Sequence, residues 1–143
     1  MAARRRALLT VTVVAGLLGT APAPADDDLY RALGGADGLV ALTDAFLLQI
    51  ADDRRVSDRF LESDIGRFRR LFAEHLCALT GGPCVYTGDD MPTTHGGMRI
   101  REAEFNAVVE DLIEAMETLD LDLRTQNRLL ARLAPLQHDI VGK

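Results

Sequence analysis

The stretch from Cys77 to Ile100 constrains this chain more than any other, because it places one histidine between two helical patterns. It opens with turn-forming residues, including a glycine pair at 81–82, which favour a loop over a continued helix. His95 follows that loop and precedes a second glycine pair at 96–97, which lets the backbone pass close to a flat ligand. A histidine held in this way by loop backbone, with apolar residues on either side, is a candidate metal ligand through its neutral imidazole.

Elsewhere, apolar residues recur at the three- and four-residue spacing of amphipathic helices. Short alternating segments of β-branched residues are missing after the first 25 residues, so strands are not expected. We therefore expect an all-α fold with two antiparallel helix pairs, an irregular link at 57–63 and a short helical segment around His95. The expected long helices run from Asp37 or Gly38 to a stop at 51–53, from the N-cap Asp64 to the glycines at 81–82, from Arg101 to Leu119, and from Leu121-Asp122 through a kink at Pro135.

The first 25 residues have the three parts of a secretory signal peptide. Three arginines at 4–6 form a basic start, residues 7–19 are apolar and uncharged, and small residues at 21–25 suit cleavage before Asp26. A membrane anchor is the alternative, but it requires about 20 consecutive apolar residues, and this run is shorter. We expect cleavage, export to the periplasm or the extracellular space, and no stable membrane span afterwards.

Cleavage leaves residues 26–143 as one small domain. The loss of three arginines changes the formal net charge from −6 to −9. A mature chain this acidic, without a basic stripe, argues against nucleic acid as a partner. The acidic pairs at 52–53, 89–90 and 110–111 are expected at turns or on polar helix faces, without a metal-binding or catalytic role.

Both cysteines, Cys77 and Cys84, lie in this domain, seven positions apart. Because export brings the pair into an oxidising compartment, we expect a disulfide, with two reduced thiols as the alternative. The Gly81-Gly82-Pro83 turn allows the chain reversal that so short a ring requires. The spacing does not suit a C-x-x-C redox motif or a zinc site. In the chain-entropy model such a ring stabilises the fold by roughly 2.5 kcal/mol.

Short motifs spread over residues 26–141 occur in a specific order and spacing. They are Leu29-Tyr30, Leu33-Gly34-Gly35, Ala51-Asp52-Asp53, Phe60, Gly81-Gly82-Pro83, Tyr86-Thr87-Gly88, Met91, His95-Gly96, Ile100, Phe105 and Leu133-Ala134-Pro135. Together these motifs resemble the group 1 truncated haemoglobins. The resemblance implies a two-over-two globin sandwich around haem b. The sequence has no C-x-x-C-H attachment motif, so we expect the haem to be bound non-covalently.

The resemblance implies that His95 is the axial ligand of the haem iron, a role that also suits its imidazole and apolar flanks. It further implies that Phe60 stacks against the porphyrin and that Phe105 and Val108 line the proximal side. The other expected haem contacts are Phe46, Phe68, Phe72, Met91 and Ile100.

The distal side of the expected pocket departs from a pattern common in that family. Many members carry a tyrosine on the first long helix and a glutamine on the next, which hydrogen-bond dioxygen. We assign these positions to Phe46, and to Phe68 and Phe72, so the pocket is expected to be apolar. Without a hydrogen-bond donor, O₂ should dissociate faster, whereas the binding of CO and NO should weaken little because they are less polar when bound. This disfavours oxygen-dependent NO detoxification and leaves open whether the protein is an enzyme; no catalytic residue is assigned.

His75 follows Phe68 and Phe72 on the same helical face. Three roles stay open for it: ordinary packing, a hydrogen-bond donor at the haem edge or distal side, and a sixth ligand of the iron. The remaining histidine, His138, lies among polar residues of the last expected helix, and we expect it at the surface.

Three classes of function remain. The first, which the resemblance favours, is reversible binding of a diatomic gas (O₂, NO or CO), as in oxygen binding or transport. The second is haem-based redox chemistry or electron transfer, favoured if His75 is a sixth ligand. The third is a haem-free helical binding module. A gas ligand and an unidentified electron donor are the expected partners.

Overall fold

The structure is a computed structural model that describes residues 27–143, so the predicted signal peptide at 1–25 lies outside the described residues. Within this part every regular element is a helix, and the one β-bridge joins Ile100 to Val141. The prediction of an all-α fold is confirmed. No helix among residues 27–143 is long and apolar enough to cross a membrane. The elements are α1 (Asp27–Ala32), α2 (Gly35–Asp52), η1 (Ser57–Phe60), α3 (Ile65–Leu79), α4 (Met91–His95), α5 (Glu102–Thr118), α6 (Leu123–Leu133), η2 (Ala134–Leu136) and α7 (Gln137–Ile140).

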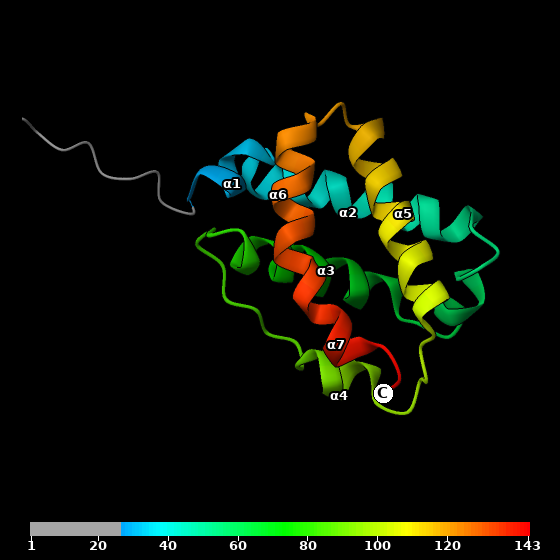
Figure 1. The fold of residues 1–143 in the computed structure, drawn as a ribbon. Helices are drawn as coiled ribbons and strands as arrows, with labels where there is room; N and C mark the ends of the chain where they lie inside the picture. Colours follow the sequence, from blue (N-terminus) through cyan, green and yellow to red (C-terminus); the bar gives the residue numbers. More distant parts are fainter. Residues whose placement is uncertain (1–26) are drawn as a thin grey trace, which may run out of the picture.

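The long helices form two antiparallel pairs, α2 with α3 and α5 with α6, and the second pair crosses the first (Figure 1). Helix α2 is central because it packs against both α3 and α5. The short α1 contacts α2 and α6, and the short α4 contacts α7 near the C-terminus. The predicted arrangement of two helix pairs is therefore confirmed.

The core is built on one face of α2. Leu39, Leu42, Phe46 and Ile50 follow helical spacing along that helix and are almost fully buried. Full burial of a large aliphatic or aromatic side chain contributes about 1.5–3 kcal/mol, so this cluster is a main source of stability. Its partners from the other long helices are Leu76 and Cys77 of α3, Ala107, Leu112, Ala115 and Met116 of α5, and Leu129 of α6.

Three aspartates begin helices as N-caps: Asp64 for α3, Asp90 for α4 and Asp122 for α6. Each carboxylate accepts a hydrogen bond from the backbone amide three residues later, at 2.9, 2.8 and 2.9 Å respectively. Such a cap stabilises a helix by about 1 kcal/mol. The predicted start of the second long helix at Asp64 is confirmed, and α4 is the short helical segment expected around His95.

Two helix boundaries differ from the prediction. Helix α2 begins at Gly35, before the expected start, because Gly34 and Gly35 adopt positive φ angles of 87° and 66° that turn the chain directly from α1 into α2. At the other end of the chain, Pro135 ends α6 rather than kinking it. Proline lacks the amide hydrogen that a continued helix needs, and the chain passes through η2 into the separate helix α7.

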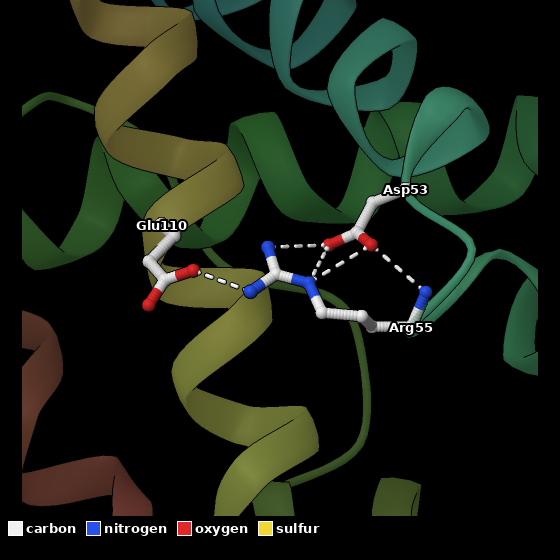
Figure 2. A network of polar contacts seen from close by, with 3 residues as sticks. All are labelled: Asp53, Arg55 and Glu110. Atoms are coloured by element: carbon white, nitrogen blue, oxygen red, sulfur yellow. Dashed lines mark hydrogen bonds and ion pairs between the residues drawn. The ribbon is translucent and has the colours of Figure 1, made fainter.

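A polar network ties the end of α2 to the middle of α5 (Figure 2). Arg55, just after α2, donates to the carboxylate of Asp53 at 2.8 Å and to that of Glu110 at 2.6 Å. The neighbouring Asp111 was expected on a polar face, and that prediction is wrong. It is only 3% exposed, and its Oδ2 has no hydrogen-bond partner among the described residues.

This environment changes the protonation of Asp111. Its burial, and next the negative charge of Asp53, raise the pKa of Asp111 from 3.8 to about 6. The folded state therefore binds this proton more tightly than the unfolded chain does. The resulting stabilisation is fully present below pH 3.8 and is lost as the pH rises through about 6.

Asp111→Asn should remove this pH dependence, because an amide has no charge to bury. From about pH 4 to about pH 7 the parent should lose at most about 3 kcal/mol of unfolding free energy relative to the variant. Urea unfolding followed by circular dichroism at a series of pH values measures the difference. Asp52→Asn, which changes an exposed carboxyl at the end of α2, is the matched control. Its unfolding free energy should change with pH with the same slope as that of the parent. Equal slopes for the parent and Asp111→Asn would contradict the argument.

Candidate functional site

His95 is the last residue of α4, and its side chain is half-buried. Its Nδ1 lies 2.9 Å from the carbonyl oxygen of Met91, one turn earlier. A carbonyl only accepts hydrogen bonds, so Nδ1 carries the proton and, in the neutral ring, Nε2 has the free lone pair. Helix α4 therefore presents an oriented imidazole that can bind a metal through Nε2.

The chain just after His95 is held by the C-terminal residues. The amide of Arg99 donates to the carbonyl of Lys143 at 2.7 Å, and the amide of Gly142 donates to the carbonyl of Ile100 at 2.9 Å. These bonds join the segment after α4 to the segment after α7. Helix α7 itself packs against α4. The C-terminus therefore helps to set the position of His95.

Glu104, in the first turn of α5, is the centre of a charged cluster. Its carboxylate accepts from the Arg59 guanidinium at 2.8 and 3.0 Å and from the backbone amide of Arg101 at 2.8 Å. The same guanidinium donates to the carbonyl of Met98 at 3.1 Å. Since Arg59 directly precedes Phe60, the cluster joins η1, the segment after His95 and the start of α5.

The hydrogen bonds of Arg101 and Arg59 lower the pKa of Glu104 from 4.5 to about 2. Glu104 itself is only 6% exposed, which restricts access of water to its carboxylate, whereas Arg59 and Arg101 are exposed. The stabilisation that the ionised carboxylate provides is present above pH 4.5 and is lost as the pH falls through about 2.

Four of the five phenylalanines form one continuous row of rings. Phe60 of η1 meets Phe68 edge-on at a centroid distance of 5.6 Å. Phe68 stacks on Phe72, one turn later on α3, at 5.5 Å, and Phe72 stacks on Phe46 of α2 at 4.9 Å. Each such pair contributes about 0.5–1.5 kcal/mol beyond the area that it buries. The structure thus brings four of the predicted site residues together in one apolar row of side chains that cannot donate hydrogen bonds.

The predicted site residues differ in how far they are covered. Phe46 is 2% exposed and belongs to the protein core, so its contact with a ligand stays a prediction. Phe105 and Val108 of α5 are half-buried, and Val108 packs against the core cluster. The carbonyl of Met91 accepts the hydrogen bond from Nδ1 of His95, and Ile100 forms the β-bridge with Val141 in the C-terminal segment.

His75 lies one turn beyond Phe72 on α3 and meets the ring of Tyr86 edge-on, with the centroids 5.0 Å apart. Its Nε2 is buried and has no hydrogen-bond partner in the described part of the chain. Burial lowers the pKa of His75, which favours the neutral imidazole. The ring contact with Tyr86 is a packing interaction, and the unpaired Nε2 leaves the two other roles open. His138, by contrast, is exposed on α7 as predicted.

The sequence pattern that defines the bacterial-like globins matches residues 28–142. The chain belongs to the bacterial-like globin family. It is 27% identical over 115 residues to a group 1 truncated hemoglobin of Tetrahymena pyriformis, an alignment that covers 80% of this chain and 95% of that protein. It is 28% identical over 112 residues to group 1 truncated hemoglobin GlbN of Mycolicibacterium paratuberculosis, covering 78% of this chain and 82% of the relative.

The fold agrees with this membership. The crystal structure of the Tetrahymena pyriformis truncated hemoglobin in its Fe(III) form superposes with a TM-score of 0.78 at 27% identity, over 80% of this chain and 98% of that one. The 2/2 hemoglobin of a Synechococcus species superposes with a TM-score of 0.73 at 21% identity, over 79% and 97%. The predicted two-over-two truncated globin fold is therefore confirmed.

Globins hold haem, and the residues of this chain fit haem b. Helix α4 offers one imidazole with a free Nε2, and the phenylalanine row offers apolar side chains, of which Phe60, Phe68 and Phe72 are half-buried. Among residues 27–143 no group of three or more His, Cys, Asp or Glu side chains could hold a bare metal ion. One imidazole donor and the apolar phenylalanine row suit a large apolar ligand that brings its own metal.

Sequence reasoning missed Glu104 and its partner Arg59. One local signal was available, because an acidic residue three positions after Arg101 suits a helix N-terminus. The contact with Arg59 spans 45 residues and leaves no local pattern.

Glu104→Ala should loosen the segment between His95 and α5, because the Arg101 amide and the Arg59 guanidinium lose their acceptor. We expect hydrogen exchange of the Arg101 amide to accelerate about tenfold, together with a lower melting temperature. Glu102→Ala, an exposed change in the same helical turn, is the control and should alter neither. Unchanged exchange at Arg101 in Glu104→Ala would show that the cluster does not hold this segment.

Proposed function

We propose that this protein binds a diatomic gas reversibly at a haem iron held by His95. The observation that carries the proposal is the bond between Nδ1 of His95 and the Met91 carbonyl, since it orients the ring and leaves Nε2 as the metal donor. Family membership supports the haem itself. When bound, haem supplies the iron position at which O₂, NO or CO coordinates.

The remaining side chains have separate roles in this proposal. Phe60, Phe68 and Phe72 would pack against the porphyrin and exclude water from the gas side, and Phe105 and Val108 would line the proximal side. The Asp90 cap and the packing of α4 on α7 would hold His95 in place. The relatives' names describe them as hemoglobins, which supports gas binding or transport as the role.

The apolar row favours rapid exchange of O₂ rather than its firm retention. A neutral hydrogen bond to a bound ligand contributes about 0.5–1.5 kcal/mol, and neither Phe68 nor Phe72 can donate one. Bound CO is less polar than bound O₂, so its affinity should depend little on such a donor. The same absence of a donor argues against oxygen-dependent detoxification of NO as the main activity.

A second candidate is haem-based redox chemistry with His75 as sixth ligand of the iron. One specific observation favours it: Nε2 of His75 is buried and unpartnered among the described residues, and burial favours its neutral, metal-binding form. Such a protein would need an electron donor. An absorption spectrum of the ferrous protein distinguishes the two candidates, since six-coordinate iron without added gas supports the second.

We also propose that the protein is exported and that Cys77 and Cys84 are joined there. The signal-peptide pattern supports export, and the structure pairs the two cysteines with their Cα atoms 5.8 Å apart. The intact mass of the secreted protein, with and without reduction and alkylation, tests both points. A chain that still contains residues 1–25, or that alkylates at both cysteines without reductant, would contradict them.

His95→Gly should weaken haem retention by at least about 100-fold, because the iron loses its protein ligand. Soret absorbance after gel filtration and haem transfer to apomyoglobin measure the loss. Added imidazole should restore the spectrum, since it can enter the space of the missing side chain and supply the same donor.

His138→Gly, which changes an exposed histidine, is the matched control and should keep the parental spectrum. A normal five-coordinate ferrous spectrum of His95→Gly without imidazole would overturn the assignment of His95.

Phe72→Gln should slow the release of O₂, because its amide adds a hydrogen-bond donor to the apolar row. The expected change is about two- to tenfold in the dissociation rate, with a much smaller effect on CO. Stopped-flow displacement of each gas from the ferrous protein measures the rates. Phe72→Leu, which removes the ring without adding a donor, is the control. Equal effects on O₂ and CO would contradict the apolar-pocket argument.

A further inference from the structure

The loop after α3 runs back along the end of that helix, and three pairs of residues between the two follow a regular order. Successive residues of the loop pair with successively earlier residues of the helix, so the two segments are antiparallel. We call these six residues the clasp. The pairs are Cys84 with Cys77, Tyr86 with His75, and Thr87 with Glu74.

The disulfide is the covalent member of the clasp. At the far end, the Thr87 hydroxyl donates to Glu74 at 2.7 Å and accepts from Arg70 at 3.0 Å. Both Thr87 and Arg70 are exposed, and polar contacts in water hold a loop only weakly. The bond between Cys77 and Cys84 limits how far the loop can move away from α3, so the clasp depends on it.

The middle pair of the clasp keeps His75 inside the molecule. The imidazole meets the Tyr86 ring at 65°, and its Nε2 is buried without a partner among the described residues. A buried polar atom without a partner is unfavourable, because water would satisfy it. The imidazole should therefore move into solvent once the loop that covers it is free. While it stays inside, it lies on the same face of α3 as Phe68 and Phe72.

We propose that the clasp is a thiol-sensitive device that holds the His75 imidazole on the gas side of the haem, and that reduction of the disulfide releases it into solvent. The proposal rests on the proposed function for the presence of haem, but not for the movement of His75. In it Tyr86 is a positioning residue that acts through His75.

The chemistry is exchange with a dithiol. A dithiol thiolate attacks Sγ of Cys84, which is half-buried, whereas Cys77 is 2% exposed. Cys77 leaves as a thiolate and takes a proton. The second thiol of the reagent then attacks the mixed disulfide, releases Cys84, and becomes a disulfide itself, so two electrons and two protons pass to the protein. A hollow between α2 and α3, lined by Val40, Ala73 and both cysteines among others, brings small reagents to the bond.

The first experiment needs no haem. The full chain is prepared without haem, its helicity is checked by circular dichroism, and diethyl pyrocarbonate acylation of each histidine is followed by mass spectrometry with and without dithiothreitol. Reduction should accelerate acylation of His75 on the order of tenfold, with exposed His138 as the internal reference. The double variant Cys77→Ser/Cys84→Ser should react at the fast rate without reductant. In Tyr86→Ala, acylation of His75 should also be fast with the disulfide intact, whereas in Tyr86→Phe it should stay slow.

The second experiment uses the ferrous haem-loaded protein, so that the reductant does not change the oxidation state of the iron. Reduction of the disulfide should change the O₂ dissociation rate several-fold. His75→Leu should have the rate of the reduced parent and should not respond to dithiothreitol. Alkylation and mass measurement establish in each sample that the disulfide has opened.

The outcomes separate the two proposals. Unchanged acylation of His75 after complete reduction would overturn the clasp. Faster acylation with an unchanged O₂ rate would show that the clasp moves His75 but not at the haem, which overturns its gas-side role. A chain that takes up no haem would overturn the proposed function and that gas-side role together, while the first experiment still decides the clasp.

Discussion

The carboxylate of Glu104 joins parts of the chain that are far apart in sequence, and the geometry of the candidate site depends on it. It accepts hydrogen bonds from Arg59 and from the backbone of Arg101, and Arg59 in turn holds the Met98 carbonyl. Phe60 follows Arg59 directly, and His95 lies just before Met98. One nearly buried anion therefore helps to set the position of the first ring of the phenylalanine row relative to the helix that carries His95.

The molecule combines a well-buried core with a more open functional side. Helix α2 buries Leu39, Leu42 and Ile50 in the core that it shares with α5, whereas α3 buries few of its residues. Phe68 and Phe72 on α3 stay half-buried beside that core. A large flat ligand needs apolar surface of this kind, rigidly supported from behind, and the contact of Phe72 with the buried Phe46 provides the support. The well-buried core thus supports the phenylalanines of the candidate site.

Most helix positions could be predicted because the signals are local. Asp64 caps α3 through an amide three residues away, and the glycines at 81–82 end that helix because they favour the loop conformation. The start of α2 and the behaviour of Pro135 were harder, since each depends on how a short helix packs nearby: α1 against α2, and α7 against α4. Periodicity alone cannot show whether a chain that turns at such a point continues its helix or begins another.

The sequence by itself determined the helical class, the short helical segment around His95, and the apolar character that Phe60, Phe68 and Phe72 give to the candidate site, because periodicity and composition act over a few residues. The tertiary structure alone decided which polar groups meet. Burial of Asp111 beside Asp53, the 45-residue contact between Arg59 and Glu104, and the cover of His75 by Tyr86 all require distant segments to pack together. Burial removes water from such groups, so their protonation and their chemistry depend on neighbours that no local pattern specifies.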